Sequence, residues 1–301
     1  MAELNFVSYE PINRGWSRDK KYCVTDIHGT RYLLRISPLD QFSTKESEFE
    51  MMQQIELLGV PMCRPIEFGT CKGGVYSIQS WIEGKAAEDV IPTLSHAKIY
   101  MYGLEAGRIL RLIHSIPAPT GWQDWETRFN KKIDRNIKDY ANCPIKHDAG
   151  YIFIEYIDSH RGLLKNRPQV YQHGDYHIGN MTIDNMGQLN IIDFDRNDYG
   201  DPWEEFNRIV WSVQISPIFA SGIVNGYFDG TVPMMFWKLL ALYISSNALS
   251  SLPWAIPFGQ SEIDVMLNQA KQILEWHDYM QSPIPTWYLG PGEHDLPFQN
   301  L

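Results

Sequence analysis

Hydrophobic and polar residues follow two different periods along the chain. Up to about residue 83 they alternate in short runs, which predicts β-strands at residues 7–11, 21–25, 32–36, 66–68 and 75–82. One segment in this part has a helical period instead, because Phe49, Met52 and Ile55 are spaced three residues apart. We expect a helix over residues 43–58 that Gly59 ends.

From residue 84 onwards, hydrophobic residues recur at every third or fourth position, as on one face of an α-helix. This spacing predicts helices at residues 95–114, 125–140, 150–165, 202–214, 217–227, 232–252 and 261–280. Four prolines after residue 282 predict an extended tail. We therefore expect an α+β fold with a β-rich domain over residues 1–83 and a helical domain over residues 84–301, joined by a hinge at about residues 79–84.

The composition narrows the range of partners. With 36 acidic and 26 basic residues the formal net charge is -10, which argues against nucleic acid and suits a cationic small molecule. The apolar runs are short, and Lys238 interrupts the one at residues 234–244, so we expect no membrane span. The amino terminus lacks the pattern of a signal peptide. Together with four scattered cysteines, this predicts a cytoplasmic protein with reduced thiols.

Residues 170–195, "VYQHGDYHIGNMTIDNMGQLNIIDFD", form a strand-like segment inside the helical part. Two short apolar stretches in it, residues 181–183 and 189–192, are separated by "DNMG", in which Gly187 permits a tight turn. This pattern predicts a β-hairpin. A hairpin brings the two ends of its segment together, so the polar residues that flank it would become neighbours.

The ends of this hairpin carry the side chains that phosphoryl transfer needs. Asn180 precedes the first arm and Asp193 follows the second, so the hairpin would place them side by side. An amide oxygen and a carboxylate can hold Mg²⁺ against the phosphates of a nucleotide. Asp175 is a separate carboxylate that can orient an acceptor hydroxyl and take its proton. This chemistry depends on placement and charge neutralisation more than on a strong base.

The segments "HGDYHIGN" and "IIDFD" resemble the catalytic and metal-binding segments of the aminoglycoside phosphotransferase family, relatives of the protein kinases. The spacing from Asp175 to Asn180 is that of the kinase catalytic loop. Gly174 replaces the Arg of the kinase pattern, and the metal-binding triplet, "DFG" in kinases, ends here in Asp195. Both departures argue against a protein kinase. The resemblance covers roughly residues 11–213. It implies a protein-kinase-like bilobal fold, with a small antiparallel β-sheet lobe carrying one helix and a larger, mainly helical lobe.

The resemblance also implies roles for individual residues. Asp175 would be the catalytic residue, and Asn180 and Asp193 would hold Mg²⁺. Arg35 lies where the family has a lysine that binds the nucleotide phosphates, and Glu48 would be the acidic partner of this cation. Arginine keeps the charge and binds phosphate through a fork of donors, but it is not equivalent to lysine.

Other segments resemble parts that contact the nucleotide, ATP or GTP. In "NRGWSRDKK", which resembles the loop over the phosphates, Gly15 would allow close backbone approach and Ser17 would donate to a phosphate. In "QSWIEG", which resembles the hinge, the backbone of Ser80 and Ile82 would meet the base. Carboxylates of the helical lobe usually line the acceptor site in this family. The candidates here are Asp198, Glu155, Asp158, Glu205, Glu275 and Asp278.

The resemblance implies a small-molecule kinase, that is, a phosphotransferase with an alcohol group as acceptor. We expect it to move the γ-phosphate of ATP or GTP onto a hydroxyl of an aminoglycoside-like antibiotic, which would confer antibiotic resistance. The same fold serves other acceptors, among them choline, homoserine, thiamine, a fructosamine or a macrolide. The acceptor therefore stays open at this point.

Other hypotheses use the same residues differently. His173, Asp175 and His177 alternate, so on a strand they would point to one side as ligands of a metal-dependent hydrolase, with the aspartates of "DFD" beside them. Both histidines are better suited to brace the loop by hydrogen bonds. A non-catalytic nucleotide-binding protein is a further hypothesis because of Arg35. Without the hairpin, Arg35 and Glu48 would be no more than a surface ion pair.

Overall fold

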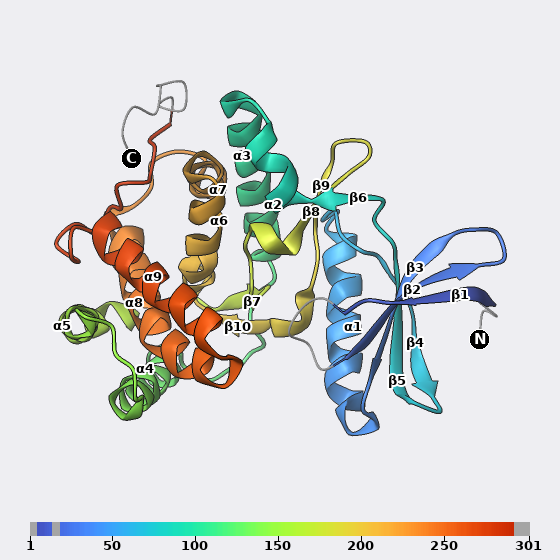
Figure 1. The fold of residues 1–301 in the computed structure, drawn as a ribbon, viewed down its shortest axis with the longest axis horizontal. Helices are drawn as coiled ribbons and strands as arrows, with labels where there is room; N and C mark the ends of the chain where they lie inside the picture. Colours follow the sequence, from blue (N-terminus) through green and yellow to red (C-terminus); the bar gives the residue numbers. More distant parts are fainter. Residues whose placement is uncertain (1–4, 14–18, 292–301) are drawn as a thin grey trace. The chain divides into compact units, whose positions relative to one another are not determined.

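In the computed structural model, which describes residues 5–13 and 19–291, five antiparallel strands form the sheet of the N-terminal part (Figure 1). The strands are β1 (Phe6–Pro11), β2 (Lys20–Asp26), β3 (Arg31–Ser37), β4 (Pro65–Cys71) and β5 (Gly74–Ser80). Their order across the sheet is β1-β2-β3-β5-β4. All five strands that the alternating pattern predicted are present, with slightly different ends.

The two faces of this sheet differ in character. One face is apolar and aromatic, because Val24, Leu34 and Ile78 form a buried cluster on it. The side chains packed against this cluster are Phe6, Tyr22, Tyr32, Ile36 and Tyr76. Lys21 and Arg35 lie opposite each other on β2 and β3, one residue out of phase with that cluster, so both project from the other face. The second face therefore carries the positive charge.

Helix α1 (Phe42–Leu57) packs against β4 and β5. The ring of Phe49 on α1 lies 5.5 Å from the ring of Phe68 on β4. Gly59 follows the helix with a φ of +80°, a left-handed conformation that favours glycine. The helix expected over residues 43–58, and its end at Gly59, are confirmed.

A second, three-stranded sheet contains the expected hairpin. Its strands are β6 (Gly84–Ala86), β8 (Met181–Asp184) and β9 (Leu189–Ile191), in the order β6-β8-β9. Met181 lies opposite Ile191, and Gly187 turns the hairpin with a φ of +83°. The amide of Ile191 also donates to the carbonyl of Pro61 at 2.8 Å. The hairpin is confirmed, whereas its pairing with β6 was not visible in the sequence.

Contacts divide the described chain into two units. The first contains the described residues up to Val90, His173–Asp175 and Asn180–Asn197, and the second contains Ile91–Gln172, Tyr176–Gly179 and the residues from Asp198 onward. The first unit is discontinuous because the hairpin pairs with β6 and with the segment after α1. The sequence-based boundary between residues 83 and 84 stays a prediction.

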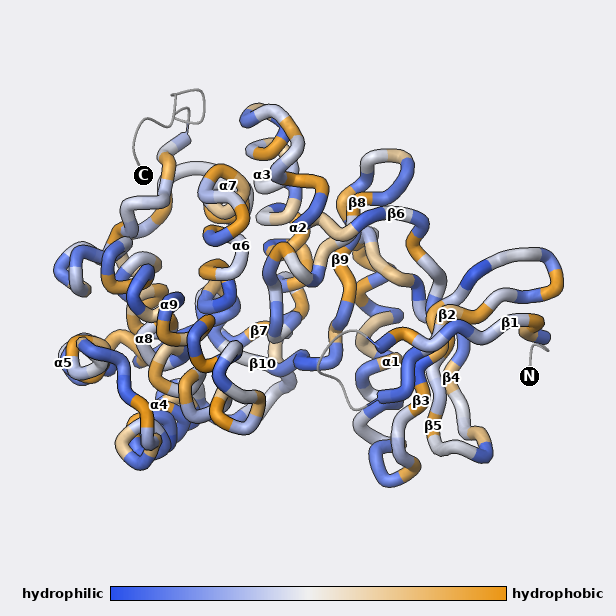
Figure 2. Tube along the Cα trace, in the orientation of Figure 1, coloured by the Kyte–Doolittle hydropathy of each residue, from blue (hydrophilic) through white to orange (hydrophobic). Residues whose placement is uncertain are grey.

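The second unit consists mainly of helices. They are α3 (His96–Ile113), α4 (Trp125–Asn142), α5 (Gly150–His160), α6 (Ile209–Ile215), α7 (Pro217–Phe228), α8 (Met234–Ala255) and α9 (Gln260–Trp276). A short antiparallel pair, β7 (Val170–Gln172) and β10 (Asp198–Gly200), accompanies them, and the one-turn helix α2 (Ala87–Val90) belongs to the first unit. Hydrophobic residues predominate in α7 and α8 (Figure 2). The expected α+β architecture, an antiparallel sheet followed by a helical remainder, is confirmed.

Two predicted helices are partly irregular, and buried polar contacts account for one of them. Residues 150–165 are α-helical only to His160 and continue as a 3₁₀ turn. Residues 202–214 begin with a 3₁₀ segment, Glu204–Arg208. Before it, the fully buried Asp201 accepts from the Trp203 amide at 3.0 Å and pairs with Arg167 at 2.6 Å. These bonds fix the chain at the start of the segment.

Helix α8 begins two residues later and ends three residues later than the sequence pattern predicted. The span Met234–Phe258 is long and apolar enough to cross a membrane, with a mean hydropathy of 1.3 over its most apolar window. However, 67% of that window is buried inside the structure, as in the core helix of a globular protein. Its buried aromatic residues support this view, since Trp237 packs against Trp287 at 6.5 Å between ring centroids.

Helices α3 and α7 lie side by side and approach closely because glycines line their contact (Figure 1). A Cβ atom on Gly103 or Gly107 of α3 would overlap the backbone of α7, and one on Gly226 of α7 would overlap the backbone of α3. Small residues at these positions therefore set the distance between the two helices.

Gly107→Ala should destabilise the protein, because its new methyl group would meet the carbonyl of Ile223. We expect a loss of about 1–3 kcal/mol in the free energy of unfolding, measured by urea denaturation. Gly162→Ala is the control, since nothing lies within 4 Å of its added Cβ. We expect that variant to change stability by at most about 0.5 kcal/mol. Equal losses in both variants would contradict the close-packing explanation.

Candidate active site

The hairpin places the predicted catalytic and metal-binding residues next to one another. The amide of Ile192, beside Asp193, donates to the carbonyl of Asn180 at 3.0 Å. The side-chain nitrogen of Asn180 donates to the carbonyl of Asp175 at 2.9 Å. Because the amide nitrogen of Asn180 is used in this way, its oxygen is the atom that a cation would contact. The structure therefore brings together all three residues that the sequence singled out.

Asp193 has an unusual backbone conformation. Its φ of 67° and ψ of 65° lie in the left-handed region, which aspartate and asparagine tolerate better than most residues. Its carboxylate oxygen Oδ1 lies 3.3 Å from Nη1 of Arg35. A strained residue at such a site indicates that the surrounding structure holds it in place.

His173 braces this loop from inside. Its side chain is fully buried and packs on the ring of Phe194, with centroids 4.6 Å apart. Nδ1 accepts from the amide of Asp175 at 3.3 Å, so Nε2 carries the proton and donates to the carbonyl of Ile192 at 3.0 Å. His173 thus connects the loop that carries Asp175 to the segment before Asp193.

Gly174 and Arg196 form a contact that sequence reasoning missed. Gly174 has a φ of +85°, and a Cβ atom there would overlap the backbone carbonyl of Arg196. The side chain of Arg196 lies beside the candidate base, with Nε 3.8 Å from Oδ2 of Asp175. The backbone of Arg196 occupies the space that a side chain at position 174 would need. This explains why a glycine replaces the kinase arginine there.

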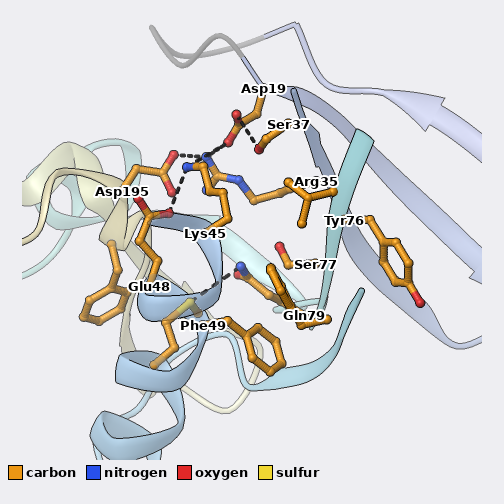
Figure 3. A pocket seen from close by; sticks show the side chains of 14 residues that line it. Asp19, Arg35, Ser37, Lys45, Glu48, Phe49, Tyr76, Ser77, Gln79 and Asp195 are labelled. Atoms are coloured by element: carbon orange, nitrogen blue, oxygen red, sulfur yellow. Dashed lines mark hydrogen bonds and ion pairs between the residues drawn. The ribbon is translucent and has the colours of Figure 1, made fainter. Parts of the chain in front are cut away.

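Arg35 is the central cation of the site. It is only 6% exposed, and its guanidinium contacts carboxylates from three positions, Asp19 at 3.1 Å, Asp193 at 3.3 Å and Asp195. Figure 3 shows the side chain of Arg35 directed toward Asp19 and Asp195. A buried charge of this kind is stable only when it is paired with anions.

The prediction that Glu48 pairs with Arg35 is wrong. Its carboxylate pairs with Lys45, three residues earlier on α1, at 2.8 Å, and not with Arg35. Lys45 also lies 3.5 Å from Oδ2 of Asp19, the same oxygen that Arg35 contacts. The spacing of Lys45 and Glu48 on one helix was the available signal, because residues three apart on a helix are neighbours.

Burial and neighbouring charges shift the pKa values of this group. Burial alone would raise the pKa of Asp19, but the Ser37 hydroxyl and the charges of Lys45 and Arg35 hold it below the usual value. Burial raises the pKa of Glu48 despite its hydrogen bond from Lys45. Burial, and then the charge of Arg35, lower the pKa of Lys21. Two cations side by side on one sheet face favour the binding of an anion.

A small cavity of about 20 Å³ lies where these side chains converge. Charged residues line it together with apolar ones, among them Phe49, Met52 and Phe68. Figure 3 shows the charged residues and Phe49 around it. This volume holds about one water molecule. The cavity is therefore not a nucleotide pocket itself, and it marks the point at which the cations of the sheet and of α1 meet the "DFD" segment.

The residues present fit a divalent cation. Asn180 and Asp193 offer an amide oxygen and a carboxylate, the hard oxygen donors that Mg²⁺ prefers. Arg35 and Lys45 between them contact four carboxylates, namely Asp19, Glu48, Asp193 and Asp195. With the neighbouring Lys21, three cations face these four anions. The remaining negative charge is one that a divalent cation would balance.

Among the described residues, the structure does not contain the metal site that the hydrolase hypothesis requires. Within the part of the chain that the structure describes, no group of three or more His, Cys, Asp or Glu side chains could hold a metal ion. His173 is used inside the first unit, as described above. His177 belongs to the second unit, where its Nδ1 accepts from the amide of Gly179 at 3.1 Å.

The remaining predicted nucleotide contacts are only partly described. Gly15 and Ser17 lie outside the described residues. The amide of Ser80 donates to the carbonyl of Arg64 at 2.9 Å. The backbone group of Ser80 that would contact a nucleotide base is therefore its carbonyl. Ser80 and Ile82 both line an open pocket of about 300 Å³. Their contact with a base stays a prediction.

The six candidate acceptor residues lie on different elements and have different partners. Glu205 is 2% exposed and accepts from the amide of Tyr176 at 3.3 Å, which indicates a structural role. Both carboxylate oxygens of Asp198 accept from Arg128, at 2.8 and 2.9 Å. The other four are exposed positions on α5 and at the end of α9, namely Glu155, Asp158, Glu275 and Asp278. Their role in acceptor binding stays a prediction.

The fold is that of the protein-kinase-like phosphotransferases. The sequence profile of the phosphotransferase enzyme family (APH) matches residues 8–237. The chain therefore belongs to this family, and the expected class, a phosphotransferase with an alcohol group as acceptor, is confirmed. No curated protein matches the sequence.

Solved structures share the fold at low sequence identity. A mutant of aminoglycoside 2'-phosphotransferase-IIIa in complex with GDP is similar with a TM-score of 0.68 and 16% identity, covering 93% of this chain and 95% of that chain. A choline/ethanolamine kinase family protein from Mesorhizobium loti is similar with a TM-score of 0.67 and 14% identity. The match covers 94% of this chain and 92% of that chain. A thermostable mutant of aminoglycoside phosphotransferase APH(4)-Ia with ADP and hygromycin B is similar with a TM-score of 0.63 and 14% identity. The match covers 90% of this chain and 94% of that chain. These likenesses confirm the protein-kinase-like fold.

Gly174→Ala should disrupt the loop that carries Asp175. Gly29→Ala is a matched control, because Gly29 has a similar φ of +82° but nothing within 4 Å of its added Cβ. The control should lose about 1–2 kcal/mol, the penalty for a left-handed alanine. Gly174→Ala should lose about 1–3 kcal/mol more, because of the overlap with Arg196. Chemical denaturation measures both, and equal losses would show that the overlap relaxes without penalty.

Proposed function

We propose that this enzyme transfers the γ-phosphate of ATP or GTP to a hydroxyl group of an aminoglycoside-like, cationic small molecule, with Mg²⁺ bound at Asn180 and Asp193. The observation that carries the proposal is the contact of Arg35 with Asp193 and Asp195. This contact puts a cation suited to phosphate beside oxygen donors suited to a metal. Asp175, the candidate base, is joined to the same donors through Asn180.

Each residue has a distinct task in this reaction. Asp175 accepts the proton of the acceptor hydroxyl as the new oxygen–phosphorus bond forms and the bond to the leaving nucleoside diphosphate breaks. Arg196, at 3.8 Å, orients the carboxylate of Asp175. Arg35 offsets charge on the phosphates. When bound, Mg²⁺ would neutralise phosphate charge at Asn180 and Asp193.

The cationic acceptor rests on charge and on the character of the structural neighbours. The net charge of -10 attracts cations, and exposed carboxylates are available in the second unit. The neighbour APH(4)-Ia is described with ADP and hygromycin B, and another neighbour with GDP, which supports both nucleotides as candidates. A smaller cationic alcohol such as choline is the second candidate, because the Mesorhizobium loti protein is almost equally similar in fold.

A cytoplasmic location and a role in antibiotic resistance complete the proposal. The four cysteines are all free thiols, which suits a reducing compartment where ATP and GTP are available. Phosphorylation would add negative charge to an aminoglycoside and weaken its binding to its target. Expression of the gene in a susceptible bacterium should then raise the inhibitory concentration of the antibiotic that the enzyme phosphorylates in vitro.

Asp175→Asn should abolish turnover without abolishing nucleotide binding. The amide cannot accept the hydroxyl proton, so we expect kcat to fall by about 10²- to 10⁴-fold. The measurement is transfer of label from γ-labelled ATP and GTP to a panel of aminoglycosides, choline, homoserine, thiamine and macrolides. Asp264→Asn, an exposed change on α9, is the control and should keep the parent rate. A kcat within tenfold of the parent in Asp175→Asn would contradict the assignment.

Metal dependence is tested by thermal stability. A nucleotide at 100 times its Kd should stabilise the folded enzyme by about 2.7 kcal/mol, seen as a higher Tm. EDTA should remove most of this increase. Asp193→Asn should remove the Mg²⁺-dependent part as well, since asparagine accepts the left-handed φ of 67° but lacks the charge. An increase in Tm that is unaffected by EDTA would contradict a metal-bound nucleotide.

A further inference from the structure

Lys45 occupies a position from which it can reach an anion at Arg35. It lies on α1, its side chain is 17% exposed, and it lines the cavity that Arg35 and Asp195 also line. Figure 3 shows Lys45 and Arg35 converging on Asp19 although they come from a helix and a strand. Lys45 is therefore a further cation of this site, and neither the sequence pattern nor the family comparison pointed to it.

Asp19 links the two cations. One of its oxygens, Oδ2, lies 3.1 Å from Nη2 of Arg35 and 3.5 Å from Nζ of Lys45. Its other oxygen accepts from the hydroxyl of Ser37 at 2.7 Å. One carboxylate oxygen thus lies between two positive groups. A phosphate, which has several anionic oxygens, suits such a pair better than a single carboxylate does.

The two cations differ in how they are held. The guanidinium of Arg35 contacts Asp19, Asp193 and Asp195, so its fork of donors is directed at carboxylates from three positions. Lys45 contacts Asp19 and Glu48 through one ammonium on a flexible stem. An ammonium of this kind can turn toward an incoming anion with little loss of geometry, whereas a planar fork cannot.

We propose that Lys45 binds the nucleotide phosphates directly, while Arg35 mainly holds Asp193 and Asp195 in position. The two residues would divide the work that a single strand lysine does in related enzymes. This inference rests on the proposed function, because it requires a nucleotide at this site. In the structure, Glu48 and Asp19 hold the ammonium of Lys45 where the phosphates would take it over.

Binding measurements that separate the phosphates from the nucleoside test this inference. Calorimetry with Mg²⁺ compares the non-hydrolysable analogues AMP-PNP and GMP-PNP with adenosine and guanosine. Lys45→Met should weaken binding of the triphosphate analogue roughly ten- to hundredfold, as expected for one lost charge-assisted hydrogen bond, and leave nucleoside binding unchanged. Lys45→Arg should restore most of the loss. Lys72→Met is the control, since Lys72 is exposed in the turn between β4 and β5.

Glu48→Gln distinguishes phosphate binding from a purely structural pairing. If Lys45 only neutralised Glu48, Glu48→Gln and Lys45→Met would have the same effect on both ligands. Under our proposal, Glu48→Gln keeps the preference for triphosphate over nucleoside, and Lys45→Met loses it. Should Lys45→Met fold poorly, Lys45→Gln is measured in the same way, with Tm as a check of folding.

The outcomes separate this inference from the proposed function. Unchanged triphosphate affinity in a folded Lys45→Met protein would overturn the role of Lys45 and leave the kinase function intact. Equal losses for nucleoside and triphosphate would also overturn it, because they indicate a general structural effect. A parent enzyme that binds none of the four probes would overturn the proposed function and this inference with it.

Discussion

A buried guanidinium needs anionic partners, and this requirement determines the geometry around Arg35. Because Arg35 is only 6% exposed, leaving its charge unpaired would destabilise the folded protein by several kcal/mol. Its partners come from distant parts of the chain, since Asp19 lies 16 positions before it and Asp195 lies 160 positions after it. The sheet and the "DFD" segment must therefore fold together. Apolar packing of Phe194 against His173 sets the segment's position, and the ion pairs set its orientation.

The same constraint accounts for an arginine where related enzymes have a lysine. A lysine has one ammonium, which would not reach carboxylates at three positions, whereas the planar fork of Arg35 does. A cation that is held this firmly is less free to follow a phosphate during transfer. The presence of Lys45 on the adjoining helix, bridged to Arg35 by Asp19, offsets that loss of freedom. Arg35, Asp19 and Lys45 are thus parts of one arrangement.

Local patterns made the hairpin predictable, whereas the ion pairs depend on tertiary distances. Asn180 and Asp193 could be placed together from sequence because alternating residues and Gly187 define the turn between them. Glu48 was assigned to Arg35 because the family resemblance implied that pair, yet Lys45 is nearer on the same helix. The acids of the helical part show the same limit. Glu205 is buried and Glu155 is exposed, although both occur in amphipathic segments.

The glycine in "HGD" shows how a departure from a family pattern can be a consequence of structure. A side chain at position 174 would overlap the carbonyl of Arg196, so the chain cannot carry the kinase arginine there. Arg196 comes from the segment after Asp193, and its own guanidinium lies near Asp175. A positive group beside the base is therefore present, but it is supplied from another part of the chain. Because the overlap is with a backbone carbonyl, the glycine at position 174 follows from the path of the chain after Asp193 and does not depend on the arginine side chain at position 196.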